Sequence, residues 1–345
     1  MPRLRTAVLV AGAALLTRRA MRRRIQASPL WPLPALENPV SGQGRPRGLR
    51  LLVTERAEAA EGVVRLTLKG EDLPVWEPGA HLDLVLPSGL VRQYSLCGDP
   101  ADPSSYTVAA RLVEDGRGGS REVHEQLHEG TEIEVRGPRN RFPLTPAPSY
   151  VFVAGGIGIT PVLPMVRALA AAGANWRLVY CGRSRASMPF LEEVEELGGD
   201  RVAVVAGVPD MADVFSGVAE GTAVYCCGPE GLMDAVAQAL PTGCTLHLER
   251  FAPRARGEAA AFEAELRRTG RTLTVAAGQS LLAAVREELP NVPYSCEQGF
   301  CGTCQQRVLE GEIDHRDELL TDAEREDSML ICVSRCRGER LVLDL

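Results

Sequence analysis

The sequence has no apolar run long enough to cross a membrane. Its longest, Ala7–Leu16, has ten small or apolar residues, whereas a transmembrane helix needs about 20. No A-x-A cleavage site follows this run and its basic cluster follows it instead of preceding it, so a secretory leader is not expected. The net charge of −7 disfavours a nucleic-acid partner. The five histidines stand in no triad context, and we expect no dedicated catalytic acid or base.

Charge is split along the chain. Residues 1–50 hold ten arginines and one acid, whereas the remainder holds 28 basic and 44 acidic residues. Arginines beside an apolar run suit an anionic membrane surface, and a basic tail without a partner is the alternative. We therefore expect a cytoplasmic protein and leave open a peripheral membrane contact through residues 1–25.

Composition and the spacing of apolar residues divide the 345 residues into four parts. Residues 1–48 form the basic tail and a linker rich in proline and glycine. In 49–145, six short alternating segments predict an antiparallel β-barrel. In 146–252, apolar segments alternate with helical stretches, which predicts an α/β doubly wound parallel sheet. In 258–345, predicted strands and one helix surround a cysteine-rich loop.

Cysteine is concentrated near the C-terminus, where five of the ten cysteines fall within the last fifty residues. Cys296, Cys301 and Cys304 have the C-x4-C-x2-C spacing that, with a distant fourth cysteine, is typical of plant-type [2Fe–2S] clusters. We predict Cys332 as the fourth ligand because it follows an apolar run, and Cys336 is the open alternative. A structural zinc site is the competing interpretation. The five scattered cysteines are expected to be inert, buried thiols.

Glycine-rich turns follow two strands of the predicted parallel sheet. The first, Gly155-Gly156-Ile157-Gly158-Ile159-Thr160-Pro161, joins a strand to a helix. Glycines there let a diphosphate approach the N–H groups at the helix N-terminus. The second, Cys227-Gly228-Pro229, ends a later strand of the same sheet. Because ligands collect at the carboxyl ends of such strands, the two turns predict a nucleotide site. A plain strand–helix turn is the alternative.

A third cluster lies on a predicted barrel strand. Arg92 can hold a phosphate, Tyr94 can pack on a flat ring, and the Ser95 hydroxyl can hydrogen-bond a ring nitrogen. Further along, Gly118-Gly119-Ser120 precede a helix and offer backbone donors to the same phosphate. As a pattern alone this cluster is weak, because a polar edge strand looks similar.

Together, these motifs occur in an order that resembles the phthalate dioxygenase reductase family and looks closest to the reductase components of vanillate demethylase-type oxygenases. The resemblance covers about residues 49–345. It implies a multidomain protein with a ferredoxin-reductase-like flavin barrel, a pyridine-nucleotide domain, and an α+β ferredoxin-like β-grasp domain that holds a 2Fe-2S cluster. FMN is the flavin that the resemblance implies, with FAD as the alternative.

The resemblance also implies roles for single residues. Arg92, Ser95 and Ser120 are expected around the FMN phosphate or ring, with Phe251 as a neighbour of the ring face. Gly156 and Cys227 are expected to face the nicotinamide nucleotide. The cofactor-binding positions that we expect are Arg92, Tyr94, Ser95, Leu96, Val108, Arg111, Gly118, Gly119, Ser120, Gly155, Gly156, Gly158, Thr160, Arg183, Cys227, Gly228, Pro229 and Phe251.

The segment after the second strand of the predicted parallel sheet bears on the choice between NADH and NADPH. No acid follows the second strand of the predicted parallel sheet, where one would bind a ribose 2′-hydroxyl. Arg183, Ser184 and Arg185 stand there instead and could bind a 2′-phosphate. The resemblance favours NADH, which we keep, with NADPH as the alternative.

Electron counting then gives the function. NAD(P)H donates two electrons as a hydride, whereas a 2Fe-2S cluster accepts one, so a flavin is needed to divide the pair. We predict the reductase component of an oxygenase system, which delivers electrons to a terminal oxygenase, either a Rieske-type enzyme or a cytochrome P450. A redox-sensing iron–sulfur flavoprotein is the alternative class.

Acidic residues follow the cysteine loop, among them Glu310, Glu312 and Asp314. Residues 258–345 hold 17 acidic and 10 basic residues. An acidic rim around a redox centre can steer a basic partner, and a merely solvated surface is the alternative.

Overall fold

The computed structural model describes residues 48–345 except 115, 117, 252–259, 295, 296, 300, 301 and 318. The tail with its expected membrane contact therefore lies outside the described residues. Within the described part of the chain, no helix is both long and apolar enough to cross a membrane.

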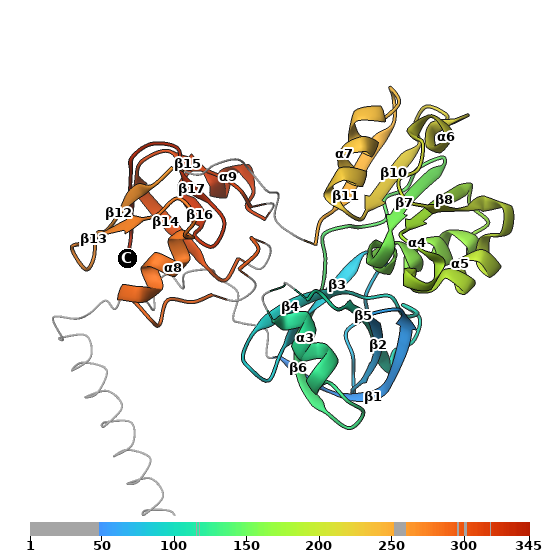
Figure 1. The fold of residues 1–345 in the computed structure, drawn as a ribbon, viewed down its shortest axis with the longest axis horizontal. Coiled ribbons are helices and arrows are strands. Elements are labelled where there is room, and N and C mark those ends of the chain that lie inside the picture. Colours follow the sequence, from blue (N-terminus) through green and yellow to red (C-terminus); the bar gives the residue numbers. More distant parts are fainter. Residues whose placement is uncertain are drawn as a thin grey trace, which may run out of the picture. The chain divides into compact units, whose positions relative to one another are not determined.

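The first domain is an antiparallel barrel (Figure 1). Its elements are β1 (Leu49–Ala60), β2 (Val63–Lys69), β3 (Ala80–Val85), β4 (Val91–Ser95), β5 (Ser105–Arg111), α3 (Gly119–Gln126) and β6 (Glu132–Asn140). The six strands follow the order β4-β3-β6-β1-β2-β5. A bridge between Leu96 and Val108 joins the two edges of this sheet. Alternate side chains point inward and form one apolar core, which includes the fully buried Leu66 and Leu82.

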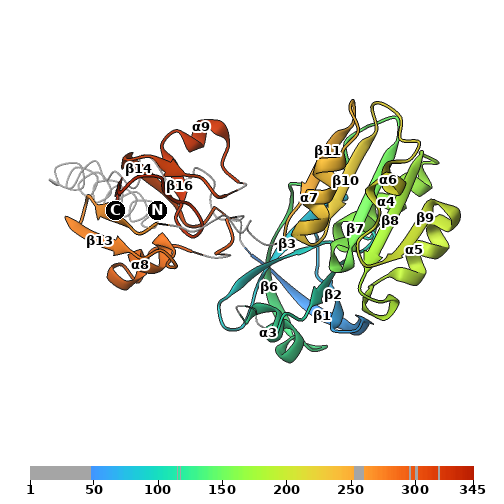
Figure 2. The ribbon, with the colours of Figure 1, turned by 45° about the horizontal axis from the view of Figure 1, so that its top comes forward.

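The second domain is built on a parallel sheet. Its strands are β7 (Tyr150–Gly155), β8 (Trp176–Gly182), β9 (Val202–Ala206), β10 (Ala223–Cys227) and β11 (Thr245–Glu249), and its helices include α4 (Ile159–Ala171), α5 (Leu191–Gly198), α6 (Met211–Phe215) and α7 (Glu230–Ala239). All five strands are parallel, in the order β11-β10-β7-β8-β9. The chain adds β8 and β9 on one side of β7 and then β10 and β11 on the other. One apolar core forms under α4 and α5 and another under α6 and α7, so helices cover both faces (Figure 2). This is the doubly wound arrangement predicted from the alternating pattern.

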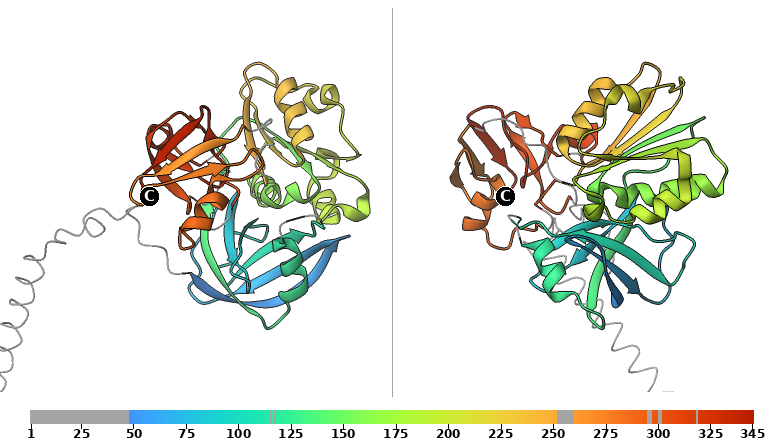
Figure 3. Two further views of the ribbon diagram at one scale, coloured as in Figure 1. Left: turned by 60° about the vertical axis from the view of Figure 1, so that its left-hand side comes forward. Right: turned by 45° about the vertical axis from the view of Figure 1, so that its right-hand side comes forward.

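The C-terminal domain combines a mixed sheet with one main helix (Figure 3). Its elements are β12 (Phe262–Leu266), β13 (Arg271–Val275), α8 (Leu281–Glu288), β14 (Gln305–Glu310), β15 (Ile313–Asp314), α9 (Asp322–Arg325), β16 (Ser328–Leu330), β17 (Arg335–Cys336) and β18 (Arg340–Leu343). The strands of the larger sheet follow the order β13-β12-β18-β14-β16, and only β12 and β18 pair in parallel. Apolar residues of α8 share a core with this sheet.

Candidate active site and iron–sulfur site

A cavity of about 200 Å³ has residues of both the barrel and the parallel-sheet domain in its walls. It is lined by His81, Gln93, Ser95, Arg141, Leu248, Glu249, Arg250, Phe251 and Gln298. Pockets for whole ligands are usually about 300–1,000 Å³, so this cavity matches one ring system better than an entire nucleotide. Two predicted positions, Ser95 and Phe251, line it, and the Phe251 side chain is exposed.

Ser95 and Glu249 connect the two halves of this cavity. Ser95, at the end of β4, has its Oγ 3.4 Å from Oε2 of Glu249, which ends β11. Burial raises the pKa of Glu249 to about 8, and the hydrogen bond from Ser95 opposes that shift. The sequence interpretation did not select Glu249. Its place at the carboxyl end of a strand in the parallel sheet is the signal that could have found it.

Cys227 lies beside Glu249 in the register of β10 and β11. The thiol is fully buried, and burial together with the neighbouring Glu249 raises its pKa well above the usual range. The thiol therefore stays neutral. The predicted position Cys227 thus forms a small, uncharged part of the sheet edge next to the cavity.

His81 supplies a second polar wall that the sequence interpretation treated as packing. It lies on β3 directly opposite Ser95 and is 5% exposed. Burial, aided by Arg139 and opposed by Asp83, lowers the pKa of His81 to about 4, so its imidazole is neutral. Neither its Nε2 nor the Gln93 Nε2 has a hydrogen-bond partner among the described residues. Because unpartnered buried polar atoms are costly, these atoms fit a polar ring system in the cavity.

The predicted phosphate-binding residues come together at the start of α3. A Cβ added to Gly119 would lie 2.5 Å from Nε of Arg92, so the arginine side chain crosses the helix N-terminus at a point that only glycine leaves free. Gly118 precedes the helix and supplies no side-chain cap. The first backbone N–H groups of α3 are therefore available to an anion. Ser120 is partly committed, because its Oγ accepts a hydrogen bond from the Val113 amide.

The other expected barrel positions have varied surroundings. Leu96 and Val108 are fully buried in the barrel core, where they shape the sheet. Tyr94 is half-buried, packs against the same core, and has its pKa raised to about 12 by burial. Arg111 is exposed at the end of β5.

The two glycine turns of the parallel sheet are in backbone contact. A Cβ on Gly158 would collide with the Cys227 carbonyl group, which is 2.5 Å away at its carbon atom. Gly155 also approaches Gly228, because a Cβ on Gly228 would lie 3.0 Å from the Gly155 nitrogen. Pro229 precedes α7. The predicted motifs therefore form one surface at the carboxyl edge of the sheet.

The first glycine turn is itself the start of a helical segment. A 3-10 helix over Gly156–Gly158 leads directly into α4, and the Ile159 amide already donates to the Gly156 and Ile157 carbonyls. No side chain caps the start of this segment, whereas α6, α8 and α9 are capped by Asp210, Ser280 and Thr321. The Thr160 hydroxyl donates to the Ile157 carbonyl at 3.0 Å and so stabilises the turn itself. The backbone N–H groups of Gly156–Gly158, where the helical segment begins, fit a nucleotide diphosphate.

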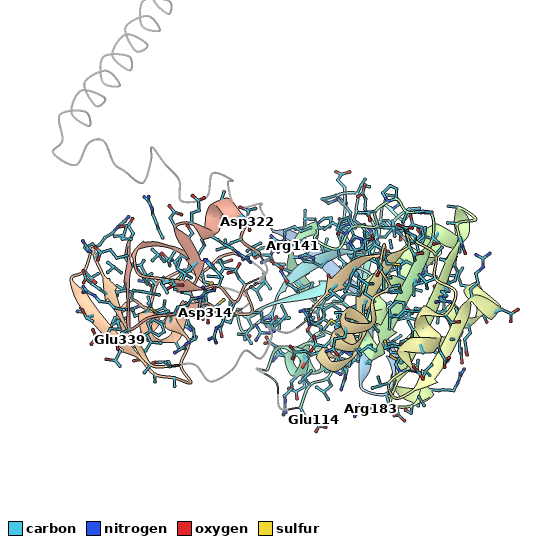
Figure 4. The ribbon with its side chains drawn as sticks, turned by 90° about the horizontal axis from the view of Figure 1, so that it is seen from above. Glu114, Arg141, Arg183, Asp314, Asp322 and Glu339 are labelled. Atoms are coloured by element: carbon cyan, nitrogen blue, oxygen red, sulfur yellow. The ribbon has the colours of Figure 1, made fainter. Side chains whose placement is uncertain are left out.

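Most polar side chains in the segment after β8 form hydrogen bonds within the protein. Arg183 is exposed at the outside of the domain (Figure 4). The Ser184 and Ser187 hydroxyls lie 3.3 Å apart, and Arg185 donates from Nη2 to Oε2 of Glu195 at 2.6 Å. Of the three groups predicted for a 2′-phosphate, two already have protein partners.

Two of the four predicted cluster ligands lie within the described residues. Cys304 and Cys332 are both buried, 2% and 7% exposed. The Cys304 carbonyl accepts a hydrogen bond from the amide of Ile331, the residue before Cys332. This backbone pairing brings Cys304 and Cys332 close together in the fold. Cys336, in contrast, lies on β17 and its thiol donates to the Arg340 carbonyl at 3.4 Å. The predicted ligands Cys296 and Cys301 lie outside the described residues.

The segment after the cysteine loop supports that loop. A Cβ on Gly299 would lie 3.4 Å from Cα of Asp317. The buried Asp317 carboxylate accepts hydrogen bonds from the Leu320 amide at 2.9 Å and from the Ser334 hydroxyl at 3.2 Å. This carboxylate is thus a structural acid and contributes nothing to an exposed rim.

Three acids of the expected acidic rim are paired with arginines. Glu310, Glu312 and Asp314 form ion pairs with Arg267, Arg337 and Arg316 at 2.7, 3.1 and 2.6 Å, respectively. Residues 258–345 still hold seven more acidic than basic residues. Electrostatic steering of a partner by this domain therefore stays a prediction.

Comparisons with known proteins agree with this geometry. The pattern of a 2Fe-2S iron-sulfur cluster binding domain matches residues 264–337, and that of an oxidoreductase NAD-binding domain matches residues 152–238. The phthalate 4,5-dioxygenase oxygenase reductase subunit of Pseudomonas putida is 38% identical, over 86% of this chain and 96% of that protein. The vanillate O-demethylase oxidoreductase of Pseudomonas sp. (strain HR199 / DSM 7063) is 39% identical, over 86% of this chain and its own full length.

A solved structure extends the similarity to three dimensions. Phthalate dioxygenase reductase, described as a modular structure for electron transfer from pyridine nucleotides to [2Fe-2S], matches with a TM-score of 0.68 and 37% identity. The match covers 86% of this chain and 98% of that one. The predicted fold class and 2Fe-2S cluster are confirmed. The chain therefore belongs to the phthalate dioxygenase reductase family: it is an NAD(P)H-dependent flavin and iron–sulfur oxidoreductase, the reductase component of an oxygenase system.

Proposed function

We propose that the flavin is FMN, with its phosphate between Arg92 and the N-terminus of α3. Its ring would enter the cavity beside Ser95. The barrel's aromatic residues support FMN over FAD. Trp76, Tyr106 and Phe142 are buried and Tyr94 is half-buried, so none is exposed as a stacking platform for an adenine.

We propose NADH as the electron donor. Its diphosphate would meet the N-terminus of α4, and its nicotinamide would lie at the edge formed by Cys227. The ion pair of Arg185 with Glu195 supports NADH, because a 2′-phosphate would have to displace this carboxylate. The four ligands proposed for the cluster are Cys296, Cys301, Cys304 and Cys332.

When bound, the flavin accepts the hydride and passes electrons singly to the cluster. The chain's own residues prepare that chemistry. Ser95 Oγ can hydrogen-bond the ring edge, and its contact with Oε2 of Glu249 orients the hydroxyl in the cavity. Neutral His81 and neutral Cys227 add no charge next to the nicotinamide and the ring. Helix N-termini and Arg92 hold the phosphates, so the protein supplies orientation and electrostatics.

The observation that carries this proposal is the cavity shared by both domains, joined by Ser95 and Glu249. An anaerobic titration with NADH tests it. We expect loss of the flavin absorbance first, followed by bleaching of the iron–sulfur bands. Extraction and chromatography of the flavin then separate FMN from FAD. A flavin that NADH leaves oxidised would overturn the proposal.

We propose that residues 49–145, 146–252 and 258–345 form the three folding domains.

We propose a Rieske-type terminal oxygenase as the partner. The names of the relatives, a dioxygenase reductase and an O-demethylase oxidoreductase, support an oxygenase as the partner. Reconstitution of product formation with a Rieske oxygenase, set against a cytochrome P450, tests the choice. Turnover with the P450 alone would contradict it.

A further inference from the structure

One arginine connects the nucleotide turn to the flavin strand. Arg167 lies on α4, the helix that begins at the Gly158 end of that turn. Its Nη1 donates to the carbonyl oxygens of Cys97 at 2.7 Å and Gly98 at 2.8 Å. These carbonyls belong to the barrel and follow Ser95 by two and three residues. A single guanidinium thus links the helix that follows the nucleotide turn to the segment that follows the flavin strand.

Arg167 is itself held in place from a second helix. Its Nε donates to Oε1 of Glu193 on α5 at 2.6 Å, and its Nη2 lies 2.5 Å from the same oxygen. The fork geometry of arginine lets one side chain bind a carboxylate and two carbonyls at once, which the single ammonium of lysine cannot reproduce. The contact is therefore specific to arginine and directional.

An apolar contact next to Arg167 includes the nucleotide turn. Ile157 of that turn and Phe190 pack against the buried barrel residues Val63, Cys97 and Ala109. Phe190 adopts φ of +58°, which is unusual for a bulky side chain.

A hydrogen-bonding group on β8 supports the same arrangement. The Tyr180 hydroxyl lies 3.1 Å from the Gly156 carbonyl and 2.8 Å from the Pro189 carbonyl. It therefore connects the nucleotide turn to the segment that carries Phe190. The turn contacts the barrel through Ile157, and Tyr180 couples it to Phe190, which contacts the barrel as well.

We propose that Arg167 is a positioning residue that sets the distance between the nicotinamide and the flavin ring. The inference rests on the proposed function, which places the nucleotide at the α4 turn and the flavin at β4. Hydride transfer needs the reacting atoms about 3–3.5 Å apart. Domains within one chain move relative to each other unless their interface holds them. Arg167 joins the helix of one site to the two residues, Cys97 and Gly98, that follow the strand of the other.

Stopped-flow reduction of the holoenzyme by NADH tests the role. In Arg167→Gln we expect the limiting rate of flavin reduction to fall at least about tenfold, since a misplacement of 1 Å can cost about a hundredfold. The Kd for NADH should change less than threefold, because the proposed nucleotide-binding groups are untouched. Arg167→Lys should recover only part of the rate. Hydrogen exchange at residues 97–98 and 157–160 should accelerate in both variants.

Arg177 offers a matched control. It also donates to two backbone carbonyls, those of Val214 and Ser216, but both lie within its own domain. Arg177→Gln should lower the thermal stability as Arg167→Gln does and leave the limiting rate unchanged. Glu193→Gln, which keeps the carbonyl contacts, should slow reduction less than Arg167→Gln and replaces it as the test if that variant fails to fold.

Three outcomes are distinguishable. A slow limiting rate in Arg167→Gln with a normal rate in Arg177→Gln supports the positioning role. A limiting rate in Arg167→Gln within twofold of the wild type, or an equal loss in Arg177→Gln, overturns it. If NADH fails to reduce even the wild-type flavin, the proposed function is wrong and this inference falls with it.

Discussion

The Ser95 hydroxyl and the Glu249 carboxylate lie 3.4 Å apart across the boundary between the barrel and the parallel sheet. The contact joins residues that are 154 positions apart in the sequence. It brings a hydroxyl proposed for the flavin to the carboxyl edge where the nucleotide is proposed. A titratable group with a raised pKa therefore lies between the two cofactor sites.

Glu249 should make stability depend on pH. Burial raises its folded pKa to about 8, whereas an unfolded glutamate titrates near about 4.3. Between these values the folded state holds a proton that the unfolded state has lost, so the free energy of unfolding falls as pH rises from about 5 to 8. In Glu249→Gln this fall should shrink, which makes the variant relatively more stable as pH approaches 8. Denaturant unfolding of both proteins from pH 5 to 9 measures the difference.

Exposed Glu58 on β1 provides the control for that experiment. Glu58→Gln should track the wild type at every pH. A difference between Glu249→Gln and the wild type that stays constant from pH 5 to 9 would mean that Glu249 titrates normally.

The phosphate cradle can be tested by closing it. In Gly119→Ala the new Cβ would meet Arg92 Nε at 2.5 Å and displace the guanidinium. FMN should then bind at least about tenfold more weakly, the loss of roughly one charge-assisted hydrogen bond. Riboflavin, which lacks the phosphate, should bind as before. Fluorescence titration of the apoprotein measures both.

Gly278→Ala is the matched control, because a Cβ at Gly278 would meet no atom within 4 Å. It should leave both affinities unchanged. Equal weakening of riboflavin and FMN by Gly119→Ala would remove the phosphate assignment.

Sequence patterns predicted the fold well where periodicity is long. The six barrel strands and the alternating strands and helices of the parallel sheet appear as expected, because each buries a regular apolar face. In contrast, β15 and β17 have two residues each, too short to show a period. Their pairing depends on contacts distant in the sequence, and no local signal reports it.

In the candidate site too, residues with a local sequence signal could be predicted, and residues whose role depends on distant contacts could not. Motif residues such as Gly158 and Cys227 could be predicted because the turn chemistry is local. Glu249 was missed although its place at the carboxyl end of a predicted parallel strand is a local signal. His81 could not be predicted, because its role arises only when β3, β4 and β11 come together around the cavity. A lone histidine in a strand carries no pattern of its own.

Nucleotide preference should depend on Glu195. While its carboxylate holds Arg185, the proposed 2′-phosphate site is occupied by the protein itself. The wild type should therefore prefer NADH in kcat/KM by at least about tenfold, about 1.4 kcal/mol. Glu195→Gln frees Arg185 and should raise kcat/KM for NADPH while that for NADH changes little. Steady-state reduction of ferricyanide measures both. Glu192→Gln, on the same helix, serves as control, and an unchanged ratio in Glu195→Gln would show that Arg185 does not reach the ribose.

The fourth cluster ligand can be identified by exchanging one sulfur at a time. Cys332→Ser should lose the cluster, because a thiolate ligand is replaced by a hydroxyl. Cys336→Ser should keep it, because that thiol already donates to the Arg340 carbonyl at the start of β18. Iron and acid-labile sulfide per chain are the measurement, and flavin content should be normal in both variants. Retention of both irons and both sulfides in Cys332→Ser would assign the ligand elsewhere.

Electron delivery to the oxygenase should respond only weakly to salt. Glu310, Glu312 and Asp314 are paired with arginines, so these three acids contribute little uncompensated negative charge. Strongly steered association accelerates encounter by about 10- to 1,000-fold and falls steeply with ionic strength. Here we expect less than about a threefold change in the second-order rate as the Debye length shortens from about 30 to 8 Å. Stopped-flow reduction of the oxygenase at increasing salt measures it, and reduction of the flavin by NADH in the same series provides the internal reference. A steep decline confined to the delivery step would show that acids other than these three form a steering surface, and docking would then be electrostatic instead of apolar.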